Sequence, residues 1–233
     1  MKIAVCFSGL YRKNISINPY YLHANYEKAF PDADFFYHTW DEYVTDIPVI
    51  YNDVLFSCPE PFVNYHPVFD VSVSSPHPKF PEYKKGNIPD TKKTKLLRQT
   101  KQMLGHADLL SKIPQDYDVI VRARYDVNIW DVNYDEFLNM AYEGTPVGFA
   151  TKLKQGQQFG KLHEATKEDE ETWLGHLPDY MIIHNRKKFD SEYVFRLHRE
   201  QNLLPGEWGW WQVLSEPYGD NHRVFCGYAQ IVR

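Results

Sequence analysis

Two arginines and one aspartate follow a short apolar run near the middle of the chain, and together they have the chemistry of a phosphate-binding site. Residues 119–121 read Val-Ile-Val, and Arg122, Arg124 and Asp126 come directly after them. Because side chains alternate between the two faces of a strand, we expect these three to point the same way. Ligands of open α/β sheets bind at the carboxyl ends of strands, so the pattern predicts a phosphate site assisted by a metal ion. A surface ladder of ion pairs, shared with the aspartates just before the run, is the alternative.

The start of the chain has the form of a nucleotide-binding strand and loop. Residues 2–8 form an almost continuous apolar run, which predicts a strand buried on both faces, and Gly9 ends it. Ser8, Gly9 and Arg12 are therefore candidates for contact with a nucleotide, although neither the GxGxxG nor the P-loop pattern is present. For Arg12, an ordinary surface arginine is the alternative.

Residues 91–111 have the clearest helical period of the sequence. The apolar side of this predicted helix is the core face, formed by Leu96, Thr100, Met103, Ala107 and Leu110. A neighbouring side carries Lys95, Gln99 and Gln102, and this side can present one amine and two amides to a ligand. A solvated helix face is the alternative interpretation.

Two later segments supply further candidates. Residues 177–184 predict a buried strand with Asp179 near its start. Residues 204–211 place Glu207 between two glycines and among three tryptophans, which are Trp208, Trp210 and Trp211. Because small-molecule sites are mostly apolar with a few placed polar groups, this segment predicts an aromatic wall beside an acid. Burial of the tryptophans in the core is the alternative.

The order of the predicted elements indicates an α/β protein. A helix at residues 20–29 and a strand at residues 34–40 complete a βαβ unit with the first strand. Residues 47–89 predict an irregular, proline-rich excursion, and residues 152–171 a polar loop able to act as a lid. No internal repeat is apparent, so a single domain over residues 1–233 is expected.

The composition excludes several classes of protein. The chain has 233 residues, 43% of them hydrophobic, and a formal net charge of −5, which argues against nucleic acid as the main partner. No apolar run is long enough for a signal peptide or a membrane span. The three cysteines lack the spacing of a disulfide scaffold or a zinc motif, so they are expected to be reduced. A cytoplasmic protein is therefore expected, in the host cytoplasm if the source is a virus.

With these elements in order, the sequence resembles small GT-A-type glycosyltransferases of viruses and bacteria. The resemblance rests on residues 3–12 (Ile-Ala-Val-Cys-Phe-Ser-Gly-Leu-Tyr-Arg), on His38-Thr39-Trp40, on the polar-faced helix and on residues 117–127. It implies a GT-A-like (Rossmann-like) domain with a mixed, mostly parallel sheet and helices on both faces. It also implies transfer of a sugar from a UDP- or GDP-linked donor to a glycan or other hydroxyl acceptor, as in polysaccharide biosynthesis.

The resemblance assigns roles to particular residues. GT-A enzymes hold Mn²⁺ or Mg²⁺ with an Asp-x-Asp motif, but the matching triplet here is Arg124-Tyr125-Asp126, so one carboxylate is replaced by a guanidinium able to neutralise a diphosphate itself. Asp126 and His222 are the implied metal ligands. Glu207 is the implied base for an inverting transfer, and Asp179 is the second choice. The implied donor-binding residues are Ser8, Gly9, Arg12, Lys95, Gln99, Arg122, Arg124 and Asp126, and the implied acceptor-binding residues are Trp208, Trp210 and Trp211.

Two other classes of protein fit part of the sequence. A non-catalytic carbohydrate-binding protein would explain the aromatic content of 16%, but such modules are usually all-β, so a parallel α/β sheet would exclude it. A metal-dependent phosphohydrolase could use Asp126, Asp179 and His222 on nucleotide sugars. Rapid release of phosphate without an acceptor would distinguish it from a transferase.

Overall fold

A computed structural model describes residues 1–11, 18–63, 90–130, 132–150, 163–164, 177–204, 206–219, 221–226 and 229–231. Its strands are β1 (Ile3–Ser8), β2 (Asp34–Trp40), β3 (Leu55–Cys58), β4 (Val119–Ala123), β5 (Val127–Ile129), β6 (Val147–Ala150), β7 (His163–Glu164), β8 (Met181–Asn185), β9 (Arg223–Cys226) and β10 (Ala229–Ile231). Its α-helices are α1 (Pro19–Ala29), α2 (Asp90–Lys112), α3 (Asp135–Tyr142), α5 (Ser191–Arg199) and α6 (Gly206–Leu214). Short 3₁₀ helices cover Asp41–Asp46, Val49–Val54, Arg186–Lys188 and Glu216–Tyr218.

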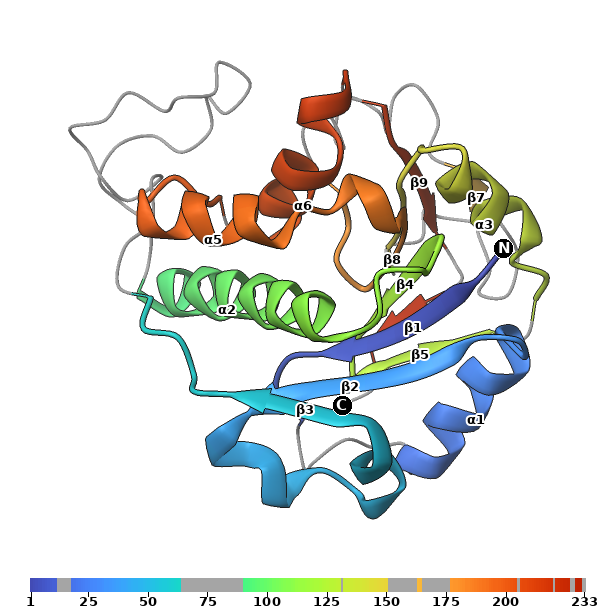
Figure 1. The fold of residues 1–233 in the computed structure, drawn as a ribbon, viewed down its shortest axis with the longest axis horizontal. Coiled ribbons are helices and arrows are strands. Elements are labelled where there is room, and N and C mark those ends of the chain that lie inside the picture. Colours follow the sequence, from blue (N-terminus) through green and yellow to red (C-terminus); the bar gives the residue numbers. More distant parts are fainter. Residues whose placement is uncertain are drawn as a thin grey trace.

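The main sheet has eight strands in the order β3-β2-β1-β4-β8-β6-β9-β7 (Figure 1). The four strands from β3 to β4 run parallel, whereas β8 is antiparallel to both β4 and β6. The predicted mixed, mostly parallel sheet of a GT-A-like α/β fold is therefore confirmed. By the same observation, the all-β carbohydrate-binding module is excluded.

Two apolar cores cover the faces of this sheet. One core contains side chains of α1 and α3, among them Tyr26 and Phe137, and the other contains side chains of α2, α5 and α6, among them Met103 and Trp210. Strand side chains alternate between these cores, because Val5 and Phe7 belong to the first and Ala4 and Cys6 to the second. Figure 1 shows α2, α5 and α6 together on one side of the sheet and α1 on the other.

Several element boundaries follow from local chemistry. Asn18 caps α1 by accepting a hydrogen bond from the backbone N–H of Tyr20 at 2.9 Å, and Pro19 starts the helix, as predicted. Along α2, the predicted core positions from Thr100 to Leu110 are buried. Near the end of the chain, β9 lies inside the sheet, between β6 and β7.

The two predicted irregular regions are only partly described. Within residues 47–89, the 3₁₀ helix Val49–Val54 and strand β3 agree with a region of short elements. Residues 64–89 lie outside the described residues, as does all of 152–171 except β7. In the described part of the chain, no helix is long and apolar enough to cross a membrane.

Strand order reverses beside β1. The connection after β1 leads through α1 to β2 on one side, and β4 pairs with β1 on the other side, in parallel, with Cys6 opposite Arg122. The helices α1 and α2 belong to opposite cores. In doubly wound sheets, the carboxyl ends of the two strands at such a reversal form the usual ligand-binding crevice.

Candidate functional site

Arg122, Arg124 and Asp126 do not lie on one face of a single strand, so the prediction that their side chains point the same way is wrong. The strand ends at Ala123, and Tyr125 and Asp126 form a turn that leads into β5. Because the chain turns, Arg124 folds back on Asp126 with two parallel hydrogen bonds, Nε to Oδ1 at 2.8 Å and Nη2 to Oδ2 at 2.9 Å. Such a two-point pair fixes the geometry of both groups.

Asp179 joins this pair to Arg122, the arginine inside β4. Its carboxylate accepts from Nη1 of Arg124 at 3.3 and 3.4 Å, and its backbone carbonyl accepts from Nη1 of Arg122. We call Arg122, Arg124, Asp126 and Asp179 the arginine cluster. It contains two guanidinium groups and two carboxylates, so its formal charges balance.

The arginine cluster is almost closed to solvent. The exposed fractions of its four residues are 0, 7, 5 and 2% in chain order. Burial lowers the pKa of Arg122 to about 10, with the charge of Asp179 acting against this shift. Burial also tends to lower the pKa of Arg124, but Asp179 and Asp126 outweigh it and raise that pKa above its ordinary value. Both guanidinium groups are therefore protonated at neutral pH.

The surface ladder considered as an alternative does not form. Asp116 pairs with the ammonium of Lys2 at 2.8 Å, and both side chains are exposed. Asp118 accepts from the backbone N–H of Lys2 at 2.7 Å. The aspartates before β4 and the charged residues after it thus belong to separate networks, one at the surface and one buried.

The polar side of α2 packs beside the arginine cluster. The amide oxygen of Gln102 accepts from Nη2 of Arg122 at 3.2 Å. A Cβ atom added at Gly9, whose φ is +115°, would lie 3.3 Å from Cγ of Gln102. At Gly206, with φ of +51°, an added Cβ would lie 2.7 Å from Oε1 of Gln99. Both glycines therefore let the backbone approach the glutamines closely, at a φ that other residues rarely adopt.

Of the other predicted donor-binding residues, Ser8 is the best defined. It ends β1, is 2% exposed, and its hydroxyl has no hydrogen-bond partner among the described residues. Arg12 and the side chain of Lys95 lie outside the described part of the structure. The structure thus brings Gly9 and Arg122 next to Gln102, and Gly206 next to Gln99.

Glu207 lies in the first turn of α6, close to the segment that carries Asp179. Its backbone carbonyl accepts from the N–H of Leu177 at 2.9 Å, which ties the start of α6 to the chain two residues before Asp179. The Glu207 residue itself is half-buried. The two predicted catalytic carboxylates therefore come from neighbouring segments.

The predicted aromatic wall is not what the structure shows. Trp210 and Trp211 are 0 and 1% exposed and belong to the core under α2, so their rings cannot meet an acceptor. The glycines beside them lie inside a helix rather than in a loop, and helical spacing turns these two rings inward. Trp208 is half-buried and is the remaining candidate for acceptor contact. Trp210 instead lies 5.0 Å from the guanidinium carbon of Arg122.

The residues predicted to bind a metal ion do not fit one as they lie. Both carboxylate oxygens of Asp126 accept hydrogen bonds from Arg124, which stands between Asp126 and Asp179 in the place of a cation. His222 contacts the hydroxyl of Ser215 through Nδ1 at 3.0 Å. Among the described residues, one group of three ligand atoms lies within 4.8 Å of one another, and it contains neither Asp126 nor His222. A cation at Asp126 stays a prediction, and so does the phosphohydrolase that depends on it.

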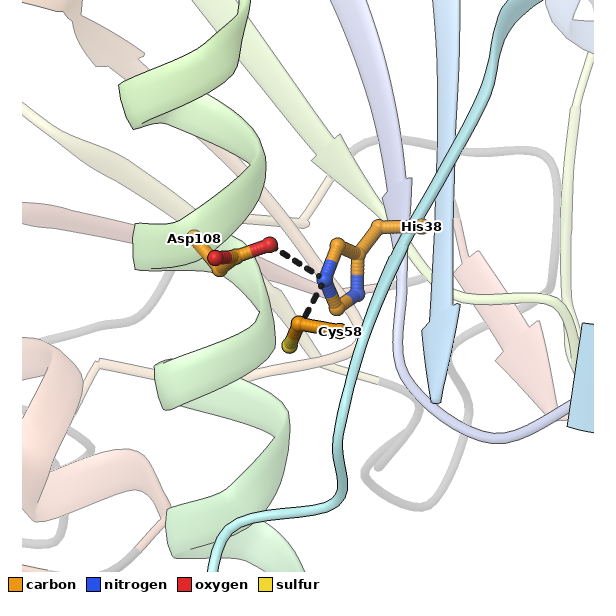
Figure 2. Close-up of side chains that lie close together, drawn as sticks. All are labelled: His38, Cys58 and Asp108. Carbon is orange, nitrogen blue, oxygen red and sulfur yellow. Dashed lines mark hydrogen bonds and ion pairs between the residues drawn. The ribbon is translucent and has the colours of Figure 1, made fainter. Parts of the chain in front are cut away.

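That group is His38, Cys58 and Asp108, which we call the edge cluster (Figure 2). From the sequence, Cys58 is expected only as a reduced thiol outside any zinc motif. No local spacing reveals the group, because His38 comes from β2, Cys58 from β3 and Asp108 from α2.

Comparisons with known proteins identify the fold. No protein-family model matches the chain, and no curated protein matches its sequence. A 4-diphosphocytidyl-2C-methyl-D-erythritol synthase from Anaerococcus prevotii matches in structure with a TM-score of 0.52 at 7% identity, over 97% of this chain and 86% of that chain. A protein from Bacillus anthracis named as a glucose-1-phosphate thymidylyltransferase matches with a TM-score of 0.51 at 10% identity, over 99% and 89%. At such identities the likeness concerns the fold alone.

Proposed function

We propose that the chain transfers a sugar from a nucleotide diphosphate sugar to a hydroxyl acceptor, with the donor diphosphate at the carboxyl ends of β1 and β4. One observation carries the proposal: the arginine cluster lies where the strand order reverses between these strands. This is the usual ligand site of doubly wound sheets. The resemblance of the sequence to GT-A-type glycosyltransferases supports the same reaction class.

Arg122 is the cation best suited to the diphosphate. Arg124 is matched by Asp126 and Asp179, whereas no carboxylate of the described residues lies within ion-pair distance of Arg122. The Nε atom of Arg122 also has no hydrogen-bond partner among those residues. A buried guanidinium with an unused donor favours an anion that accepts it. Because Arg122 is fully buried, the donor has to open this region as it binds.

Ser8 and Gly9 are proposed to complete the diphosphate site from the end of β1. The Ser8 hydroxyl is buried and unpartnered among the described residues, so an incoming phosphate oxygen would satisfy it. Gly9 keeps the backbone close to Gln102, which already contacts Arg122. Gln99, next to Gly206, is proposed to contact the sugar or the nucleoside.

The transfer step needs a good leaving group and a base. The acceptor oxygen attacks the anomeric carbon, the anomeric C–O bond to phosphate breaks, and the nucleoside diphosphate leaves with the electron pair. Arg122 is proposed to stabilise the charge that develops on the leaving phosphate. Glu207 is proposed to take the acceptor proton, because Asp179 is already held by Arg124 while Glu207 lies on the adjacent helix end.

We propose that guanidinium groups, rather than a divalent cation at Asp126, neutralise the donor diphosphate. The support is the pairing of both Asp126 oxygens with Arg124, which uses the positions that a metal ion would need. Arg124 is 7% exposed and cannot easily leave. Donor binding is therefore expected to survive a chelator.

A thermal-shift panel tests the donor site. UDP, GDP and their sugars are added to the full chain with Mn²⁺ or with a chelator, and at least one should raise the melting temperature in both conditions. Arg122→Gln should weaken binding of that nucleotide roughly 10- to 100-fold, since a charged hydrogen bond contributes about 1.5–3 kcal/mol. Arg196→Gln removes the same charge from the exposed side of α5 and should leave binding unchanged.

The outcomes separate the parts of the proposal. If no nucleotide shifts the melting temperature in either condition, the donor site is refuted. If only the Mn²⁺ samples respond, the metal-independent mode is refuted and the predicted cation at Asp126 regains support. If Arg122→Gln unfolds, Ser8→Ala is the milder variant, and it should weaken nucleotide binding without a change in the circular dichroism spectrum.

Glu207→Gln tests the base. It should lower the rate of sugar transfer roughly 10²- to 10⁴-fold while nucleotide affinity stays the same, because the proton acceptor is lost but the donor site is not. A rate within threefold of the wild type would remove Glu207 from the mechanism and favour a retaining transfer.

A second candidate is nucleotidyl transfer to a sugar phosphate. It is suggested by the names of two solved structures that share the fold. The products distinguish the two reactions: a nucleotidyltransferase releases pyrophosphate from a nucleoside triphosphate, whereas a glycosyltransferase releases a nucleoside diphosphate. Incubation with each substrate class and chromatography of the products decides between them.

A further inference from the structure

The edge cluster lies on the β2 and β3 side of the proposed donor site, and His38 is the partner of Ser8 in the β1–β2 register. Cys58 is paired with Trp40 in the β2–β3 register, and His38 is two residues from Trp40. Paired residues of parallel strands and residues two apart share a face, so His38 and Cys58 point to the same side. Asp108 reaches them from α2, which covers this side, as Figure 2 shows.

The three side chains offer a nitrogen, a sulfur and an oxygen at metal-ligand separations. Nε2 of His38 lies 2.9 Å from Oδ2 of Asp108 and 3.6 Å from Sγ of Cys58. All three ligand atoms lie within 4.8 Å of one another. Ligand atoms at the corners of a tetrahedral zinc site are about 3.3–3.8 Å apart, given bonds of about 2.0–2.3 Å. Shifts of up to about 1 Å would bring all three pairs of ligand atoms into this range.

The carboxylate of Asp108 already pairs with a cationic side chain of α2, Lys112. The ammonium of Lys112 lies 2.6 Å from Oδ2 of Asp108 and donates to the carbonyl of Ser57 at 2.8 Å. The Lys112 side chain is 33% exposed and the Asp108 side chain 20% exposed, whereas His38 is fully buried. A flexible lysine at the solvent side is a cation that a metal ion can displace.

The Cys58 thiol has to lose its proton to become a metal ligand. Binding of a divalent cation would release that proton to solvent and leave a thiolate on the metal.

We propose that His38, Cys58 and Asp108 bind one Zn²⁺ ion, with a water molecule as the fourth ligand. The site joins β2, β3 and α2, and it uses none of the residues of the proposed transfer reaction. Zinc prefers nitrogen and sulfur ligands with a carboxylate, and sites with three protein ligands and a water are common. The ion would hold β3 and α2 together, since each supplies one ligand.

Cobalt titration of the reduced full-length chain tests the site, because Co²⁺ replaces Zn²⁺ and a cobalt–thiolate bond absorbs in the near ultraviolet. The wild type should bind one equivalent with a thiolate band and should melt at a higher temperature with Zn²⁺. Cys58→Ser should remove the band. Cys226→Ser, which removes another half-buried thiol, from β9, should keep it.

Asp108→Asn is the second variant. It should weaken Co²⁺ binding more than tenfold and keep a weaker thiolate band, so it decides the matter even if Cys58→Ser does not fold. The proposal is overturned if the wild type binds no Co²⁺ tighter than about 100 μM. It is also overturned if the band survives Cys58→Ser, disappears with Cys226→Ser, or is indifferent to Asp108→Asn.

Discussion

The arginine cluster and the edge cluster share one feature: in each, an aspartate side chain is paired with a cationic side chain. In the arginine cluster the cation is Arg124, which is 7% exposed and held by two carboxylates. In the edge cluster it is Lys112, whose side chain is 33% exposed and meets a single carboxylate. This difference in exposure indicates which cation another ion can replace. The buried guanidinium of Arg124 is part of the folded core, whereas the partly exposed ammonium of Lys112 can move away and be replaced by a metal ion.

The largest effect is expected from Arg124→Met. It leaves Asp126 and Asp179 buried without their cation, and removal of one partner of a buried ion pair costs about 3–5 kcal/mol. Denaturant unfolding of the two proteins measures the loss in the free energy of unfolding. Asp126→Asn combined with Arg124→Met should recover part of it, because one uncompensated charge disappears. A loss below about 1 kcal/mol would make the arginine cluster equivalent to a surface pair.

A third buried polar pair consists of two histidines, and it is expected to make the stability of the protein depend on pH. His106 and His184 lie with their Nε2 atoms 3.4 Å apart, and burial lowers the pKa of His184 from 6.5 to about 4. Burial and then His184 also lower the pKa of His106. Below pH 6.5 the unfolded chain binds protons that the folded chain refuses, so stability should fall as the pH drops from 6.5 to 4.

The expected size of this effect is about 3 kcal/mol for His184, since each pKa unit corresponds to about 1.4 kcal/mol. Unfolding curves at several pH values measure the slope, and His184→Asn should reduce it. His198→Asn should remove a smaller part of the slope, because burial and then Arg199 also lower the pKa of this half-buried histidine of α5. A wild-type slope unaffected by His184→Asn would show that this histidine does not stay neutral in the folded protein.

The smallest effect on stability is expected from Lys112→Met. The Lys112–Asp108 pair is partly exposed, and such pairs contribute about 0–1 kcal/mol. The same change should strengthen Co²⁺ binding at the edge cluster, because the ammonium no longer competes for Oδ2 of Asp108. Unfolding and cobalt titration of one sample test both statements. Weaker cobalt binding would mean that Lys112 organises the cluster rather than occupying it.

The sequence could predict features that depend on local periodicity. The parallel start of the sheet, the cap at Asn18 and the buried stripe of α2 were all predictable, because each leaves a pattern in the sequence: a βαβ order of elements, a capping residue before a proline, and a helical period. The close approach of Gln102 to Gly9 and Arg122 also follows from a helical stripe beside a strand end.

The features that the sequence did not predict correctly depend on tertiary contacts. Trp210 and Trp211 were predicted to form an aromatic wall because glycines lie beside them, but Gly209 is needed where a Cβ atom would clash with the carbonyl of Leu204. That contact exists only once α6 has docked. The edge cluster combines residues separated by 20 and 70 positions, for which no sequence motif exists.

The short antiparallel pairing of β5 with β10 has a consequence for the order of events during synthesis. Residues 229–231 bond to residues 127–129, immediately after Asp126. Ribosomes add about 5–20 residues per second, so the turn that carries Arg124 and Asp126 waits about 5–20 s for its last neighbouring strand. During that interval the two arginines lack part of their final surroundings, and the βαβ unit formed by β1, α1 and β2 is the segment that can assemble first.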